Sequence, residues 1–140
     1  MGDVVSHERL SQSEIDSISQ LCLLCLNCRD LYSSAFSMNL PLAIMLEKIN
    51  PRRREMRIES CLSEILNALP DNTIIKEFDV LFNPNYRIDV LKLLVSVHKR
   101  KPLKAFWPGT FSCNKLIYAE EGMADYKTYN LDDYPITIMI

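Results

Sequence analysis

The amino-acid sequence predicts an α/β domain in three layers, with a mostly parallel central sheet between helices. The segment 21–27 (LCLLCLN) is apolar without alternation, which is typical of a strand covered on both faces. Later strand candidates at 73–82 and 103–107 are separated by a helical pattern of crossover length, and such connections are right-handed. Because 140 residues are the size of one domain, we expect a single domain over 1–140.

Four segments have helical patterns. Ser11 and Glu14 have the spacing of a capping box, which marks the start of a short helix. The last of the four ends in basic residues, which the helix dipole favours at a C-terminus. The predicted helices cover 8–20, 41–49, 60–69 and a segment that begins between 84 and 89 and runs through VLKLLVSVHK.

The strand candidates are rich in β-branched and aromatic residues and end at turn signals. Asn83-Pro84 breaks the segment 73–82, and Pro108-Gly109 ends the segment 103–107. Short β-prone pieces nearer the C-terminus predict a small antiparallel or mixed edge added to the sheet. These pieces cover 115–120, 126–129 and 136–140.

Composition and charge exclude several classes of protein. The formal net charge of -2 gives no global attraction to nucleic acid or to acidic membranes. The longest apolar run is shorter than the roughly 20 residues of a membrane helix, and the N-terminal segment has no signal-peptide core. We therefore expect a cytoplasmic protein without membrane contact. The odd number of cysteines, 5, favours reduced thiols over a disulfide framework.

Three cysteines in a C-x-x-C-x-x-C array raise the hypothesis of an iron–sulfur or redox module. Cys22, Cys25 and Cys28 form the array, and Cys61 is the candidate fourth ligand. The array lies in a run of leucines without glycine, and successive members of a strand array point to opposite faces. Packing of cysteines as small apolar side chains is the interpretation that the sequence favours.

No other pattern points to a metal site or a hydrolase. The two histidines, His7 and His98, have no Cys or His at metal-ligand spacing, and both are predicted to lie on the surface. The sequence contains neither G-x-S-x-G nor H-E-x-x-H. We therefore expect no metal and no cofactor.

Two basic runs are candidates for phosphate contacts. One follows a proline at 51 and the other, 98–101 (HKRK), ends a predicted helix. DNA is the partner that such local clusters would suit, but no aromatic residues are interleaved to stack on bases. A solvated charged face is therefore the favoured alternative. The candidate phosphate contacts are Arg52, Arg53 and Arg54, with Arg57 in the same cluster.

A strand end followed by Pro108-Gly109 is the most distinctive local feature, because the chain has only 3 glycines. The carboxyl ends of parallel strands are where α/β domains place their sites. An acidic, tyrosine-rich segment follows, and tyrosine is favoured at protein interfaces. Partner binding and internal packing both stay open. The candidate partner surface comprises Trp107, Gly109, Tyr118, Tyr126 and Tyr129.

The second half of the chain follows a family pattern. FDVLFNPNYRIDVLKLLVSVHKRKPLKAFWPGTF is followed by KLIYAEEGMADYKTYNLDDY. This order resembles the BrxF family, small P-loop proteins of one type of BREX (bacteriophage exclusion) defence system. In that family a strand ending in an L-F-D-P-like sequence precedes a helix, a strand ending in W-P-G, and a K-L-x-Y-A-E-x-G segment. The N-terminal half is similar to the family only in the order of its elements.

The resemblance implies that residues 21–36 correspond to the strand, loop and helix start of a phosphate-binding loop, G-x-x-x-x-G-K-[ST]. Its glycines let backbone N–H groups surround the phosphates. Here Asn27 and Tyr32 occupy the glycine positions, Ser33 occupies the lysine position, and a hydroxyl remains at Ser34. A tyrosine where the backbone must approach phosphate obstructs such a loop.

The position of the second nucleotide-site motif is altered as well. ATPases of this kind carry an acidic residue after an apolar strand to hold magnesium. Lys76 stands at that position, with Glu77 and Asp79 nearby but out of register. The resemblance therefore implies a degenerate P-loop NTPase-like domain that has lost ATP chemistry.

Two functions from different classes follow from this resemblance. The first is a non-enzymatic interaction or regulatory subunit of a phage-defence assembly, with other defence proteins or a second copy of the chain as partners. The second is an ATP-binding component or ATPase with a non-standard loop. It would require Ser34 and Asp79 to hold magnesium together, and Arg29 or Arg52 to replace the missing lysine.

Overall fold

The central sheet of the computed structural model, which describes residues 2–6, 10–25 and 32–140, is parallel throughout. In the part of the chain described, it has six strands in the order β1-β9-β2-β5-β4-β3. All neighbouring strands run in the same direction. The strands are β1 (Asp3–Val5), β2 (Leu21–Leu24), β3 (Phe36–Ser37), β4 (Thr73–Lys76), β5 (Leu103–Phe106) and β9 (Ile136–Met139).

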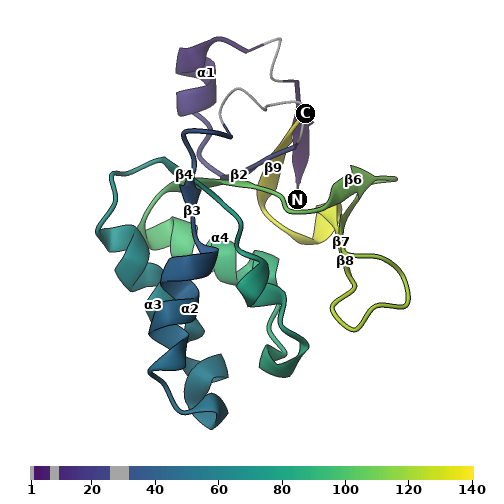
Figure 1. The fold of residues 1–140 in the computed structure, drawn as a ribbon. Coiled ribbons are helices and arrows are strands. Elements are labelled where there is room, and N and C mark those ends of the chain that lie inside the picture. Colours follow the sequence, from purple (N-terminus) through teal and green to yellow (C-terminus); the bar gives the residue numbers. More distant parts are fainter. Residues whose placement is uncertain (1, 7–9, 26–31) are drawn as a thin grey trace.

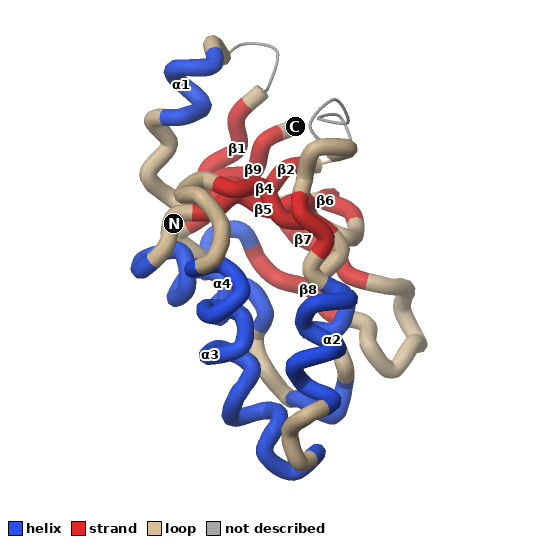
Figure 2. The backbone as a smooth tube through the Cα atoms, turned by 60° about the vertical axis from the view of Figure 1, so that its left-hand side comes forward, coloured by secondary structure: helices blue, strands red, loops and turns tan. Residues whose placement is uncertain are grey.

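Helices lie on both faces of this sheet, but unequally (Figure 1). Three longer helices cover one face: α2 (Asn39–Glu47), α3 (Arg54–Asn67) and α4 (Val90–Arg100). The short α1 (Gln12–Asp16) lies on the opposite face, as the turned view also shows (Figure 2). Ser11 caps α1 with the predicted capping box. The α/β class and the mostly parallel sheet predicted from the sequence are thus confirmed.

The apolar run of β2 is buried on both faces because it lies inside this sheet. Leu21 and Leu23 pack into the larger core beneath α2, α3 and α4. Cys22 and Leu24 pack on the other face, in a smaller core with Ile15 of α1. The absence of alternation in the sequence therefore has the expected cause, which is burial on both sides.

A separate antiparallel sheet follows β5. It consists of β6 (Thr110–Ser112), β7 (Lys115–Tyr118) and β8 (Lys127–Asn130), in that order. The predicted grouping of the C-terminal pieces was wrong in one respect, because the segment 136–140 does not belong to it. β9 instead lies between β1 and β2 in the parallel sheet, where its residues are buried.

Several predicted boundaries differ from the structure. The strand predicted over 73–82 ends at Lys76, because Glu77 adopts a left-handed conformation with φ 52° and the 3-10 helix η4 (Asp79–Phe82) follows. The helix predicted over 60–69 begins at Arg54, directly after the 3-10 helix η3 (Pro51–Arg53). The strands β1, β3 and β6 were not predicted, since two or three residues show no periodicity.

His98, which the sequence places at the surface, is partly exposed and also makes two hydrogen bonds within the protein. Its Nδ1 accepts a hydrogen bond from the amide of Leu103 at 3.1 Å, and its Nε2 lies 2.9 Å from the carbonyl oxygen of Ser19. An accepting Nδ1 places the ring proton on Nε2, which then donates to Ser19. The imidazole therefore connects the end of α4 to β5 and to the segment that precedes β2 through hydrogen bonds.

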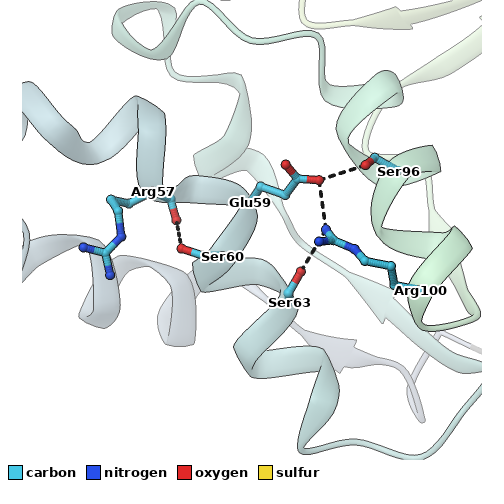
Figure 3. Close-up of polar contacts among 6 residues, drawn as sticks. All are labelled: Arg57, Glu59, Ser60, Ser63, Ser96 and Arg100. Atoms are coloured by element: carbon cyan, nitrogen blue, oxygen red, sulfur yellow. Dashed lines mark hydrogen bonds and ion pairs between the residues drawn. The ribbon is translucent and has the colours of Figure 1, made fainter.

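A small polar network joins α3 to α4 (Figure 3). Glu59 Oε1 accepts from the Ser96 hydroxyl at 2.8 Å and from Arg100 Nη2 at 2.9 Å. Arg100 Nη2 also donates to Ser63 Oγ at 3.3 Å. The ion-paired side chains are about half exposed, so this pair stabilises the helix packing by less than about 1 kcal/mol. Burial of apolar side chains is the larger contribution here.

We expect Gly109→Ala to destabilise the fold by roughly 1–3 kcal/mol. A Cβ atom at this position would overlap the carbonyl oxygen of Ile117 and approach Trp107 Nε1 at 3.0 Å. Urea denaturation followed by Trp107 fluorescence measures the change. Thr110→Ala, at an exposed position of β6, is the control and should change stability little. Equal stability of the two variants would contradict the packing argument.

Candidate functional site

The carboxyl ends of the parallel strands meet at one edge of the central sheet, where α/β domains usually bind ligands. β5 lies between β2 and β4 in the sheet, so the last residues of these three strands lie side by side along this edge. The amide of Trp107 donates to the carbonyl oxygen of Leu24 at 3.0 Å, which continues the pairing of β5 and β2 beyond the strands. The segments that follow β2 and β4 carry the residues predicted to be a vestigial nucleotide site.

Lys76 and Tyr32 from this predicted site are in direct contact. Lys76 Nζ donates to the carbonyl oxygen of Tyr32 at 3.0 Å and lies 4.2 Å from the centroid of its ring. The Tyr32 ring also meets the Phe106 ring edge to face, with centroids 5.2 Å apart. The Lys76 side chain is only 15% exposed. Its charge is therefore used inside the protein, by a carbonyl dipole and an aromatic face.

Of the other predicted residues of this site, one lies next to Lys76, two are exposed in a turn, and one is not described. Glu77 is exposed, and its carboxylate lies 3.8 Å from Lys76 Nζ. Ser33 and Ser34 are exposed in the turn before β3. Asn27 lies outside the described residues. The described part of the predicted loop thus presents a tyrosine ring and two hydroxyls.

Asp79 faces a different group of residues. Its Oδ1 accepts from Asn39 Nδ2 at 3.3 Å, and its Oδ2 accepts from the hydroxyl of Tyr118 at 2.9 Å. Asn39 Oδ1 in turn accepts from the amide of Val80 at 3.0 Å. These residues line a cleft of about 540 Å³ that Asp125 also borders. Burial, and then the hydrogen bond to Asp79, raise the pKa of Tyr118. Asn39 was not singled out by the sequence, because no motif marks it.

Most of the predicted partner surface is in the protein interior. Trp107, Tyr118 and Tyr129 are 3%, 7% and 6% exposed, so for these three residues the structure favours internal packing over contact with a partner. Tyr118 stacks on Phe82 with ring centroids 3.7 Å apart, and Trp107 meets both Phe82 and Tyr129 edge to face. We call Phe82, Trp107, Tyr118 and Tyr129 the aromatic cluster.

The aromatic cluster joins the two sheets. Trp107 Nε1 donates to the carbonyl oxygen of Ile117 in β7 at 3.0 Å. Gly109 lies against the same carbonyl group, where no side chain would fit. Tyr126, the fifth residue of the predicted surface, is half-buried. The turn after β5 is therefore a packing feature, which is one of the two interpretations that the sequence left open.

The arginines of the first basic run lie at the far end of the α2–α3 pair. η3 joins the two helices at the end that points away from the sheet (Figure 1). Arg52 and Arg53 are exposed, whereas Arg54 is half-buried and donates from Nε to the carbonyl oxygen of Ile49 at 3.1 Å. These candidate phosphate contacts are therefore separated from the carboxyl edge of the sheet.

The cysteines do not converge on a cluster site in the described chain. Cys22 belongs to the core on the α1 face, whereas Cys61 and Cys25 belong to the core on the other face. The sheet thus separates Cys22 from Cys61, and Cys28 lies outside the described residues. Within residues 2–6, 10–25 and 32–140, no three Cys, His, Asp or Glu side chains form a group that could hold a metal ion.

Comparisons of the chain with protein-family models, with curated proteins and with solved structures found no match. The relationship to the BrxF family therefore stays a prediction from the residue pattern. In the described part of the chain, no helix has the length and apolar character needed to span a membrane.

The free energy of unfolding is expected to fall as the pH rises above 10. Burial, and then the charge of Asp89, raise the pKa of Tyr129 to about 12, and the pKa values of Tyr118 and Tyr134 are raised by burial and by hydrogen bonds to carboxylates. The tyrosines of the unfolded chain release their protons at a lower pH than the same tyrosines in the folded protein. The stability that is present below about pH 10 is therefore lost as the pH approaches the folded-state pKa values. The free energy of unfolding falls by up to about 1.4 kcal/mol per pH unit for each tyrosine.

Denaturant unfolding at several pH values between roughly 9 and 12, a range that includes the ordinary tyrosine pKa, measures how steeply the free energy of unfolding falls with pH. Tyr129→Phe should flatten this slope, because the titrating group is removed. Tyr126→Phe, at a half-buried position, is the matched control and should leave the slope unchanged. A slope that Tyr129→Phe does not alter would contradict the assignment.

Proposed function

We propose that the chain is a non-enzymatic interaction or regulatory subunit of a bacterial phage-defence assembly of the BREX kind. In this proposal it is built on a P-loop-like fold that has lost its nucleotide site. The observation that carries the proposal is the contact of Lys76 with the carbonyl group and ring of Tyr32. The resemblance of the second half to the BrxF family supports the biological setting, in the cytoplasm with other defence proteins.

The chemistry of phosphate binding explains why this contact matters. A phosphate-binding loop works by backbone N–H groups that point inward and by a lysine whose ammonium group reaches the phosphates. Here the carbonyl oxygen of Tyr32 is directed to an internal ammonium group, and its ring packs on Phe106. Tyr32 and Lys76, which stand at two of the positions that would serve phosphate and magnesium, therefore contact each other instead.

The alternative, an ATPase with a non-standard loop, has less support from the geometry. It requires Asp79 to bind magnesium, but both carboxylate oxygens already accept hydrogen bonds, from Asn39 and Tyr118. It also requires a substitute cation, and η3, which contains Arg52, lies at the end of the helix pair away from the sheet (Figure 1). Arg29, the other candidate cation, lies outside the described residues.

An exposed surface suited to a macromolecular partner lies at this helix end. Arg52, Arg53 and Arg57 are exposed and form no ion pair within the described chain. Met56 is 82% exposed and lies in the first turn of α3, directly after η3. An exposed apolar side chain among arginines favours an acidic partner, either another defence protein or DNA.

Nuclear magnetic resonance with ATP and Mg²⁺ tests the loss of the nucleotide site. We expect no change in the amide signals of Leu24, Tyr32 and Glu77, and no phosphate release above that of buffer. Shifts centred on these signals in the unaltered protein would overturn the proposed loss. This readout identifies where a nucleotide binds, which a thermal shift alone does not.

A gain-of-function variant tests the P-loop-like scaffold separately. Asn27→Gly, Tyr32→Gly and Ser33→Lys together restore the pattern G-x-x-x-x-G-K-S over residues 27–34. We expect this variant to bind ATP with shifts at Leu24 and Glu77, and more strongly when Lys76→Asp is added to hold magnesium. A folded variant that binds no ATP would count against the P-loop-like fold.

The biological setting needs a test in the host. Deletion of the coding sequence should reduce protection against phage, measured by plaque formation. Complementation with Lys76→Met should restore protection if no nucleotide chemistry at this position is required. Full protection in the deletion strain would argue against a role in defence.

A further inference from the structure

A cleft of about 480 Å³ lies between the start of α4 and β8, apart from the Lys76–Tyr32 contact. The 3-10 helix η5 (Pro84–Tyr86) and the residues after it form one side, and Lys127 and Tyr129 form the other. Its volume falls within the range of about 300–1,000 Å³ that is common for small-molecule sites. We call it the Arg87–Lys127 cleft.

Two cations line this cleft. Arg87 and Lys127 are both exposed, and neither takes part in an ion pair in the described chain. Arg87 has φ 49° and ψ 40°, a left-handed conformation that is unfavourable for an arginine. Strained backbone of this kind is concentrated at functional sites, where it places a side chain.

The hydroxyl of Tyr129 is buried beside the same cleft, near Asp89 and Val90 at the start of α4. Tyr129 is 6% exposed, and within the described chain no side chain donates to or accepts from its buried hydroxyl. Tyr129 and Lys127 are two positions apart in β8, so they project from the same face. A void of about 10 Å³ beside them, also bordered by Arg87, has room for about one water-sized group.

One acidic residue also lines the cleft, but its oxygens are already engaged. Asp89 Oδ1 accepts from the amide of Lys92 at 3.0 Å as the N-cap of α4, and Oδ2 accepts from the Tyr134 hydroxyl at 2.6 Å. These bonds engage both oxygens of Asp89, while its negative charge stays close to the Tyr129 hydroxyl. The donors of the cleft without a side-chain partner are Arg87, Lys127 and Tyr129.

We propose that the Arg87–Lys127 cleft binds an organic phosphate. The phosphate group lies between the guanidinium of Arg87 and the ammonium of Lys127, and the Tyr129 hydroxyl donates to it. Two cations and a hydroxyl suit the charge and the several acceptor oxygens of a phosphate better than a carboxylate. Pro84, Ile88 and the ring of Tyr134 border the same cleft and offer apolar contact to the organic part.

Phenyl phosphate is the probe that separates these contributions, with inorganic phosphate and benzoate for comparison. Binding is followed through the amide signals of the protein, and we expect shifts at 85–90 and 127–129. Phenyl phosphate should bind more tightly than inorganic phosphate, which lacks the apolar part, and more tightly than benzoate, which lacks the tetrahedral oxyanion. No shift at millimolar probe, or shifts centred on 50–57, would overturn the proposal.

Arg87→Gly gives two opposite readouts. Glycine adopts positive φ without strain, so the thermal midpoint should rise, whereas affinity for phenyl phosphate should fall about tenfold or more. Unchanged affinity in this variant would overturn the proposal. Lys127→Gln should weaken binding to a similar degree, while Lys115→Gln, an exposed lysine of β7 outside the cleft, should not.

Tyr129→Phe tests the hydroxyl alone. It keeps the ring in the aromatic cluster and should weaken phenyl phosphate binding several-fold. The site and the proposed loss of the nucleotide loop are independent, because their amide signals belong to different segments. If both proposals hold, phenyl phosphate shifts the amide signals of residues 85–90, and ATP with Mg²⁺ leaves those of Leu24 and Glu77 unchanged.

Discussion

Trp107 is the residue on whose contacts the arrangement of the described chain depends. The backbone amide of Trp107 extends the pairing of β5 with β2, and its indole N–H donates to β7 in the second sheet. The ring contacts Phe82 and Tyr129, so one residue joins the parallel sheet, η4 and the antiparallel sheet. Such a buried aromatic residue combines a large apolar surface with one donor that must be satisfied, which fixes its orientation.

The aromatic cluster also positions polar groups on two sides. Tyr118, stacked on Phe82, directs its hydroxyl to Asp79 at the edge of the parallel sheet. Tyr129, packed on Trp107, places its hydroxyl beside the Arg87–Lys127 cleft. Because the rings are held by packing, their hydroxyl groups have little freedom to move. The same core therefore organises both the residues of the proposed vacated site and those of the cleft.

The cations of the predicted nucleotide site and those of the Arg87–Lys127 cleft have different environments. Lys76 is mostly buried and its ammonium group is satisfied by a carbonyl oxygen and an aromatic ring, as a buried charge must be. Arg87 and Lys127 stay exposed and unpaired, and the backbone at Arg87 is strained. An internally bound ammonium group at the first place and exposed, unpaired cations at the second are the basis for proposing loss of a ligand at the first and binding at the second.

The local sequence was informative where one physical requirement dominates. The capping box at Ser11, the doubly buried β2 and the stop at Pro108-Gly109 were predicted correctly, because each depends on a few adjacent residues. The end of β4 was predicted too late, since the left-handed Glu77 carries no sequence signal that marks it. His98 was assigned to the surface because its two partners, Ser19 and Leu103, are known only from the fold.

The sequence by itself therefore determined the α/β class, the parallel sheet and the absence of a standard phosphate-binding pattern. Only the tertiary structure decided that β9 enters the central sheet, that Lys76 contacts Tyr32, and that Tyr118 and Tyr129 are core residues. The physical reason is that propensity and periodicity act between neighbours along the chain. Burial and the choice of hydrogen-bond partner depend on residues far apart in sequence, which meet only when the sheets pack.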